Sequence, residues 1–372
     1  MSTRNFKRRW RATAAALAAS AALLAGAPVM AQQQVPQDLT TIPPVPTNYQ
    51  PQRTPWGDPD LRGIWPINDQ AELPVNRPEQ YGNRFFKTEE EMAKENERAE
   101  ELETRYQREE QEDSIGTGHW IEYLAGQRRT SMLVEPANGQ LPPMTPEAQK
   151  LYEAGRSSWT PNTHYNWVTD FDSWDRCISR GFPASMLPFR YNNGIRIFQS
   201  PGYVTIHLEM LGTRVIPVAG QNQQWPAPVK AWLGDSRGRW EGNTLVIETT
   251  NLKTGDSATQ DMHARNGSPL NMATRGVPPY NTIPTSEQAK VVERLTMTGP
   301  DTITYEMTYS DPEVFTAPWT VRFDWTRDQS YEFFEYACHE GNVQVRNYIT
   351  ASRAGQLEEL SADDLADEGG GH

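Results

Sequence analysis

Several signatures of catalytic chemistry are absent from this chain of 372 residues. It contains no G-x-S-x-G nucleophile elbow, no glycine-rich phosphate loop and no dinucleotide fingerprint. Its 2 cysteines are too far apart for a C-x-x-C motif, and none of its 6 histidines is paired at i and i+4. These absences argue against a serine hydrolase elbow, most nucleotide cofactors and a helical zinc site, and we predict no cofactor.

Positive charge and long apolar runs are also scarce. The chain has 35 Lys and Arg against 48 Asp and Glu, a formal charge of −13. An excess of negative charge argues against nucleic acid and anionic membrane surfaces as partners. The apolar run at 13–25 is shorter than the roughly 20 residues of a membrane span.

The N-terminal sequence predicts export. Basic residues precede the apolar run, and Ala31 supplies the small residue before a cleavage site, so residues 1–31 are typical of a signal peptide. We therefore expect a periplasmic or secreted protein without membrane insertion after cleavage. An uncleaved anchor is the alternative, and Sec and twin-arginine export both stay open.

The two cysteines are expected to pair, because an oxidising compartment favours disulfides. A Cys177–Cys338 bond would require Cα atoms within about 7 Å. It would then place residues 175–181, which include Arg176 and Arg180, against residues 335–342.

The remaining chain predicts a mainly β protein with one or two helices. We expect an extended proline-rich arm over 32–84, a helical segment over 85–155, a β domain over 156–352 and a disordered tail over 353–372. Thr88 and Glu91 fit a capping box for a helix at 85–113. Short β-rich runs follow residue 190, ending with 331–340, and residues 253–289 are predicted to be a long excursion. No helices alternate with these runs, which favours a closed antiparallel barrel that hides its strand edges.

Three motifs carry a resemblance to known proteins. TPWGDPDLRGIW at 54–65, GDSRGRWEGNTLVIETTN at 234–251 and YACHEGN at 336–342 resemble an uncharacterised family of secreted bacterial proteins. The resemblance covers most of residues 54–350, carries no catalytic residues, and implies a link to the breakdown of lignin-derived aromatics. The strand pattern also resembles a lipocalin-like barrel, which is an analogy of fold and not of function.

The stretch EYACHEGN predicts the first candidate site. If residues 335–340 form a strand, His339 points away from Cys338 and lines a pocket that the disulfide fixes from behind. There His339 would act as a base, while Arg180 or Arg176 would hold a carboxylate or phenolate. A structural ion-pair cluster is the equally weighted alternative.

A second candidate lies on the run YVTIHLEM. His207, the second candidate acid/base, and Glu209 share a strand face; a metal site there is the disfavoured alternative. Ser236 stands in a glycine-flanked stretch that predicts a turn. The residues expected to contact a ligand are Glu209, Tyr203, Tyr305, Tyr309, Arg294 and Trp319.

Together these patterns predict a cofactor-independent lyase of the decarboxylase or aldehyde-lyase type, acting on a small aromatic substrate. Such a reaction needs only proton transfer and charge stabilisation. Two alternatives stay open: a carrier that binds a hydrophobic or aromatic ligand without turnover, and a structural periplasmic or outer-membrane-associated partner. The sequence does not predict an oligomeric state.

Overall fold

A computed structural model describes residues 37–114, 127–154, 158, 164–218, 224–253, 270 and 282–368. The predicted signal peptide lies outside these residues, as do most of the predicted excursion at 253–289 and the last four residues of the chain. No helix among the described residues is long and apolar enough to cross a membrane.

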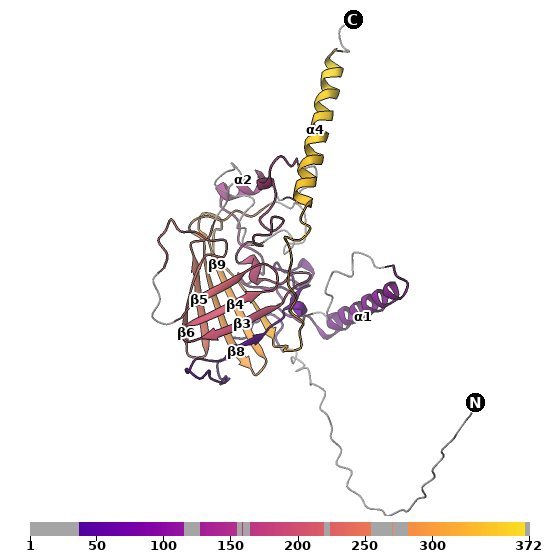
Figure 1. Cartoon of the computed structure of the whole chain (residues 1–372). Coiled ribbons are helices and arrows are strands. Elements are labelled where there is room, and N and C mark those ends of the chain that lie inside the picture. Colours follow the sequence, from indigo (N-terminus) through magenta and orange to yellow (C-terminus); the bar gives the residue numbers. More distant parts are fainter. Residues whose placement is uncertain are drawn as a thin grey trace, which may run out of the picture. The chain divides into compact units, whose positions relative to one another are not determined.

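Two antiparallel sheets form the centre of the described fold (Figure 1). The four-stranded sheet has the order β1 (Gly63–Ile64), β3 (Ile195–Ser200), β4 (Tyr203–Leu208), β5 (Thr213–Pro217). The six-stranded sheet has the order β2 (Leu133–Glu135), β10 (Trp319–Thr326), β9 (Thr302–Ser310), β8 (Lys290–Gly299), β7 (Thr244–Thr250), β6 (Asp235–Glu241). The mainly β prediction is therefore confirmed.

Alternation along β9 shows why these sequences form a sheet. Ile303, Tyr305, Met307 and Tyr309 are fully buried, whereas the residues between them are mostly half-buried. A period of two places one set of side chains on the inner face. That face packs into the core between the sheets, while the backbone of β9 pairs with β8 and β10 in antiparallel register.

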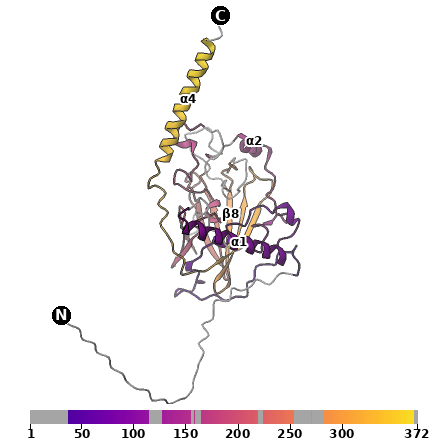
Figure 2. The ribbon, with the colours of Figure 1, turned by 90° about the vertical axis from the view of Figure 1, so that its right-hand side faces the viewer.

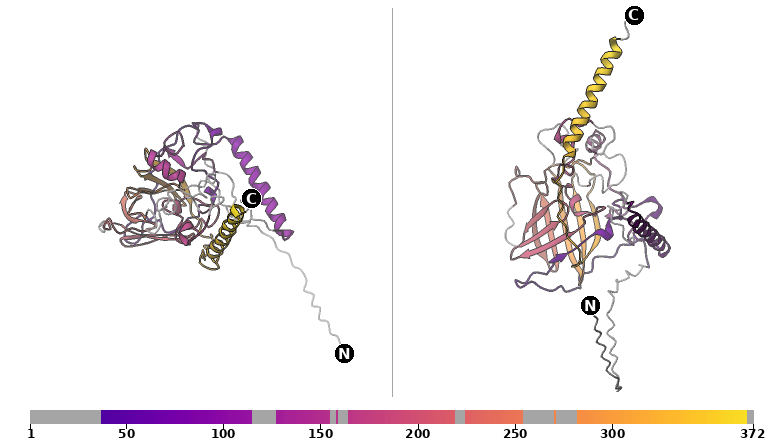
Figure 3. Two further views of the ribbon diagram at one scale, coloured as in Figure 1. Left: turned by 90° about the horizontal axis from the view of Figure 1, so that it is seen from above. Right: turned by 45° about the vertical axis from the view of Figure 1, so that its right-hand side comes forward.

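The two sheets lie face to face, with an apolar core between them (Figures 1 and 3). Their edges approach at two places: Val218 forms a parallel bridge with Gly238, and the Asp328 N–H donates to the Ile64 carbonyl over 3.0 Å. The described strands nevertheless form two sheets and not one closed ring. The predicted lipocalin-like barrel accordingly stays a prediction.

Three helices are described, α1 (Glu89–Gln111), α2 (Pro146–Ala154) and α4 (Gln344–Glu368), and Figure 2 shows α1 and α4 as continuous helices. The predicted capping box is confirmed: the Glu91 N–H donates to Thr88 Oγ1, and the Thr88 N–H donates to the Glu91 carboxylate. α1 buries none of its side chains. α4 continues to Glu368, where the sequence predicts a disordered tail, because its Ala, Leu and Glu residues favour helix.

Two local predictions are wrong. Residues 331–340 form no strand and run as an irregular segment. The glycine-flanked stretch around Ser236 is not a turn but the start of β6, paired with β7. In both places the local sequence pattern predicted the wrong secondary structure, because contacts with distant parts of the chain determine the backbone conformation.

Candidate ligand-binding site

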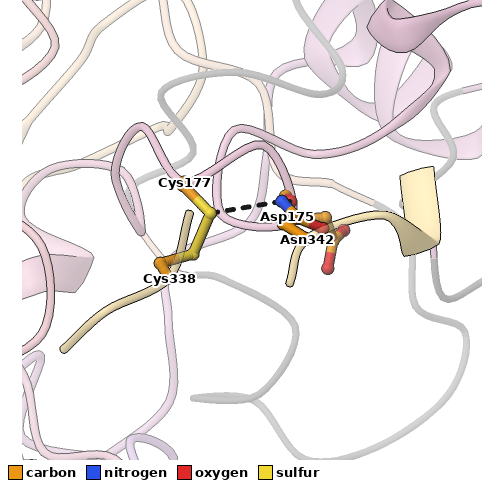
Figure 4. Close-up of a disulfide and its surroundings, with 4 residues drawn as sticks. All are labelled: Asp175, Cys177, Cys338 and Asn342. Carbon is orange, nitrogen blue, oxygen red and sulfur yellow. Dashed lines mark hydrogen bonds between the residues drawn. A yellow bond between two sulfur atoms is a disulfide. The ribbon is translucent and has the colours of Figure 1, made fainter. Parts of the chain in front are cut away.

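The disulfide Cys177–Cys338 is present, with a Cα–Cα distance of 5.6 Å, as the sequence predicts (Figure 4). Asn342 reinforces the junction. Its Nδ2 group donates to the Asp175 carbonyl over 3.0 Å and to Cys177 Sγ over 3.2 Å. The start of α4 is thereby fixed against the segment around Asp175.

A cavity of about 210 Å³ lies beside this junction. Its lining residues come from the segment before the disulfide loop and from the first turns of α4: Ser158, Tyr165, Phe171, Asp175, Asn342, Gln344, Val345 and Tyr348. This volume is below the roughly 300–1,000 Å³ of sites for drug-sized ligands. It suits a molecule with about one ring.

Aromatic rings form one wall of the cavity. Tyr165 stacks on Phe171 with ring centroids 4.6 Å apart, and Tyr348 is tilted against both rings at 5.8 and 6.3 Å. Offset and tilted rings are the preferred aromatic arrangements. The wall joins α4 to the segment around Phe171, and the Tyr165 N–H adds a 2.8 Å hydrogen bond to Ser352 Oγ.

Hydrogen-bonded polar groups also border the cavity. Ser158 Oγ donates to the Asp175 carboxylate and accepts from the Asp172 N–H over 3.1 Å. Tyr165 Oη donates to the Ser158 carbonyl. Among the described residues, the cavity is thus bordered by aromatic rings and by the Asp175 carboxylate.

Arg180, a predicted anion-binding residue, is buried away from this cavity's lining. Its guanidinium lies over the Phe189 ring at 4.5 Å and donates to the Leu187 carbonyl over 3.3 Å. Burial lowers the pKa of Arg180 to about 10, while Tyr191 and Tyr336 oppose that shift. Burial likewise raises the pKa of Tyr191 to about 12.

The other predicted groups near the disulfide are more accessible. Arg176 is half-buried, and His339 is exposed, one residue beyond Cys338. The pairing therefore brings residues 175–180 and 338–342 into one region, as predicted. Neither Arg176 nor His339 is among the residues that line the cavity.

His207 and Tyr203 lie on the outward face of β4, because Val204, Ile206 and Leu208 occupy the buried face. His207 Nδ1 is 2.8 Å from Thr213 Oγ1, and its ring stacks on Phe333.

Glu209 follows β4 and is buried. Its carboxylate accepts hydrogen bonds from four groups: Asn192 Nδ2, the Gly194 N–H, Tyr331 Oη and the Phe334 N–H. Glu209 therefore anchors the irregular segment 331–334 to the four-stranded sheet. No cluster of three acidic, histidine or cysteine residues suited to a metal occurs in the described part of the chain.

Tyr305, Tyr309 and Trp319 all lie on the inner face of the six-stranded sheet. Trp319 stacks on Tyr309, whose hydroxyl donates to Asp311 over 3.2 Å. Burial raises the pKa of Tyr305 and Tyr309 well above the usual range. These rings are core residues.

Arg294 points outward on β8. It pairs with Glu241 at 2.9 Å, and about 41% of its side chain is exposed. It therefore does not share an interior with Tyr305.

A second cavity, of about 280 Å³, lies between α1 and residues 72–81. Charged side chains of both signs line it, including Glu72, Lys87, Glu95 and Arg98. α1 forms one wall, and the ion pair of Lys87 with Glu95 at 2.6 Å helps to hold it there. The disulfide-linked cavity differs in that a covalent bond fixes the segments beside it.

Comparisons with known proteins add no relative. No family model matches the chain, no curated protein matches it, and no solved structure matches it.

Sequence reasoning missed the aromatic wall of the site. The cysteine pairing was the signal that located the region, and Asn342 stands within the EYACHEGN stretch itself. Tyr165, Phe171 and Tyr348 come from irregular or late helical sequence without a strand period, so nothing local marked them as neighbours.

Proposed function

We propose that the protein binds a small aromatic or hydrophobic molecule in the cavity beside Cys177–Cys338. The observation that carries this proposal is the combination of an aromatic wall with a polar side in one cavity held by a covalent bond. Ligand sites usually pair apolar surface with a few well-placed polar groups. A disulfide and fixed hydrogen bonds reduce the ordering that a ligand must impose.

Export to the periplasm and a lipocalin-like relationship belong to the same proposal. The disulfide supports an oxidising compartment. The approach of the two sheet edges at Val218–Gly238 and Ile64–Asp328 supports a flattened relative of a barrel. In this protein the ligand would lie beside the sheets and not in their interior, which large side chains fill.

Turnover by a cofactor-independent lyase reaction is the second proposal. Its specific support is that Asp175, Tyr165 and Tyr348, whose side chains carry ionisable or hydroxyl groups, line the same cavity. Such groups can move a proton and stabilise charge on a phenolic substrate. His339 is adjacent to this region in sequence and remains the predicted alternative base.

Calorimetric titration of the mature protein with single-ring phenols, phenolic acids and aromatic amines tests binding. Tyr348→Ala removes part of the wall and should weaken binding of any ligand about tenfold, since an aromatic contact contributes about 0.5–1.5 kcal/mol beyond its buried area. Tyr203→Ala on the outward face of β4 is the matched control. A loss in Tyr203→Ala alone would place the ligand on the sheet instead.

Mass spectrometry of products separates the carrier from the lyase. Loss of carbon dioxide or formaldehyde from a substrate, abolished in Asp175→Asn or His339→Ala, would support the lyase. Binding without any product across the same panel would contradict the lyase proposal and support the carrier proposal.

A further inference from the structure

The outer face of the four-stranded sheet carries a cationic and aromatic surface. On β3, Arg196 and Phe198 alternate with the buried Ile195 and Ile197, so both side chains point outward, and Phe198 is 50% exposed. Arg196 lies directly opposite His207 of β4 in the register of the sheet. Opposed side chains on one face have Cβ atoms about 4.5–5.5 Å apart, so a guanidinium, an imidazole and an exposed ring share this surface.

Two aromatic rings hold the Arg196 guanidinium in place. Its Cζ atom lies 6.0 Å from the centre of the Phe198 ring and 5.1 Å from the centre of the Phe333 ring. Phe333 also stacks on the His207 ring, with centroids 5.2 Å apart. Arg196 and His207 therefore contact one ring, and the cation is positioned before any ligand arrives.

Arg196 differs from the arginines on the other strands in having no carboxylate partner. Its contacts are the two rings, and it forms no hydrogen bond or ion pair with any residue in the described part of the chain. The other five strand arginines each pair with a carboxylate, namely Arg214, Arg237, Arg239, Arg294 and Arg322. In a chain with 48 acidic and 35 basic residues, an outward-facing arginine without an acid leaves its N–H donors open to an external anion.

The acid that follows β4 does not fill this role. Glu209 is buried, and its carboxylate accepts the four hydrogen bonds described above. His207 can add a donor to the surface, because Nδ1 is 2.8 Å from Thr213 Oγ1. When the Thr213 hydroxyl donates to Nδ1, Nε2 carries the ring hydrogen and can donate to an anion.

We propose that this surface binds a small aromatic carboxylate, at a site separate from the disulfide-linked cavity. Arg196 donates two parallel N–H bonds to the carboxylate, a geometry that matches its two oxygens. The ring of the ligand lies along Phe198. Val215, which is 60% exposed, extends the apolar surface across Thr205 of β4. An inorganic anion would leave this apolar surface unused.

Three probes test the proposal by NMR titration of the protein at low salt and neutral pH. They are phenylacetate, phenylacetamide, which keeps the shape and removes the charge, and acetate, which keeps the charge and removes the ring. Phenylacetate should bind at least about tenfold more tightly than either, because it alone combines charged hydrogen bonds with a ring contact. The imidazole signals of His207, assigned by comparison with His207→Gln, should shift as phenylacetate binds.

Arg196→Gln removes the cation without breaking an ion pair. In this variant the ratio of phenylacetate to phenylacetamide affinity should fall to about one. Arg196→Lys should restore part of the ratio, because an ammonium group keeps the charge but has no planar fork. Arg239→Gln on the other sheet, where Arg239 is 47% exposed and paired with Glu241, is the matched control and should keep the wild-type ratio.

Comparison with Tyr348→Ala separates this site from the cavity. A loss of phenylacetate binding in Arg196→Gln and not in Tyr348→Ala would support the sheet site. The reverse result would place the acid in the disulfide-linked cavity, which would overturn this inference and support the proposed function. Equal binding of phenylacetate and phenylacetamide, or no saturable shift of His207, would overturn the inference and leave the binding proposal for the cavity standing. Equal binding of acetate and phenylacetate would overturn the part played by Phe198.

Discussion

Arg214 on β5 and Glu293 on β8 form a buried ion pair that joins the two sheets. Their side chains are 1% and 0% exposed, and Arg214 Nη1 donates to Glu293 Oε1 over 2.9 Å. Arg214 Nη2 also donates to Ser236 Oγ and Thr249 Oγ1, and Tyr305 Oη donates to Glu293 Oε1. The pair is therefore surrounded by partners that satisfy most of its remaining hydrogen-bonding capacity.

Glu293→Gln should destabilise the protein by about 3–5 kcal/mol, because it leaves the Arg214 charge buried without a counter-charge. Urea denaturation followed by tryptophan fluorescence measures this loss. The double variant Arg214→Met, Glu293→Met should be less destabilised than Glu293→Gln, since it buries no uncompensated charge.

Arg294→Ala is the matched control for that experiment. Arg294 is the next residue on β8 and pairs with Glu241 on the exposed face of the sheet. Exposed pairs contribute about 0–1 kcal/mol, so the free energy of unfolding should change little. A similar loss in both variants would contradict a special role for the buried pair.

Removal of the disulfide should cost about 2–5 kcal/mol, because the bond closes a loop with a sequence separation of 161. Cys177→Ser with Cys338→Ser makes this change, and denaturation with and without reductant measures it. Reductant should lower the stability of the wild type and leave the double variant unchanged. Equal sensitivity of both proteins to reductant would contradict the prediction.

The strands of the sheets were largely predictable, because alternation is a local signal. In β9 the apolar residues recur at every second position, and each of Ile303, Tyr305, Met307 and Tyr309 is fully buried. The segment 331–340 has equally β-prone residues, yet it forms no strand. Its backbone is held by the Glu209 carboxylate and by the disulfide. Both contacts join residues more than a hundred positions apart, so no local sequence pattern indicates them.

The candidate site was predictable only through covalent chemistry. The pairing of Cys177 with Cys338 located the region that contains Asp175 and Asn342. The aromatic wall and the Arg214–Glu293 pair depend on how distant segments pack. Nothing in the run TRVIP marks Arg214 as a buried residue. Its partner, Glu293, lies on the opposite sheet and is known only from the structure.

Glu209→Ala should release the segment 331–334 from the four-stranded sheet. It removes the acceptor of the Tyr331 hydroxyl (2.7 Å) and of the Phe334 N–H (3.3 Å). Hydrogen exchange of amides 331–334 should become faster in the variant.

Tyr331→Phe separates the two contacts, because it removes one of the hydrogen bonds and keeps the acceptor. It should cost about 1 kcal/mol and leave the exchange of Phe334 slower than in Glu209→Ala. Unchanged exchange in Glu209→Ala would mean that other contacts, such as the stacking of Phe333 on His207, hold the segment without the Glu209 carboxylate.

Asp69 lies in a poorly solvated position beside β10. Burial is the main cause that raises its pKa to about 6, and the charge of Asp324 raises it further. Hydrogen bonds from Gln70 Nε2 (3.0 Å) and Gln127 Nε2 (3.1 Å) to Asp69 Oδ2 oppose the shift. The folded protein therefore binds a proton at Asp69 more tightly than the unfolded chain does.

The stability that Asp69 contributes should be fully present below the unfolded pKa of about 4 and should be lost as the pH rises to about 6. Urea denaturation of wild type and Asp69→Asn at pH 4, 5, 6 and 7 measures it: the variant should gain stability relative to wild type across this window. Asp60→Asn is the control. A hydrogen bond from Arg62 lowers the pKa of Asp60, so its contribution is lost only as the pH falls below the unfolded pKa of about 4, and its difference from wild type should be nearly constant from pH 5 to 7. A constant difference between wild type and Asp69→Asn at all four pH values would show that Asp69 titrates alike in both states.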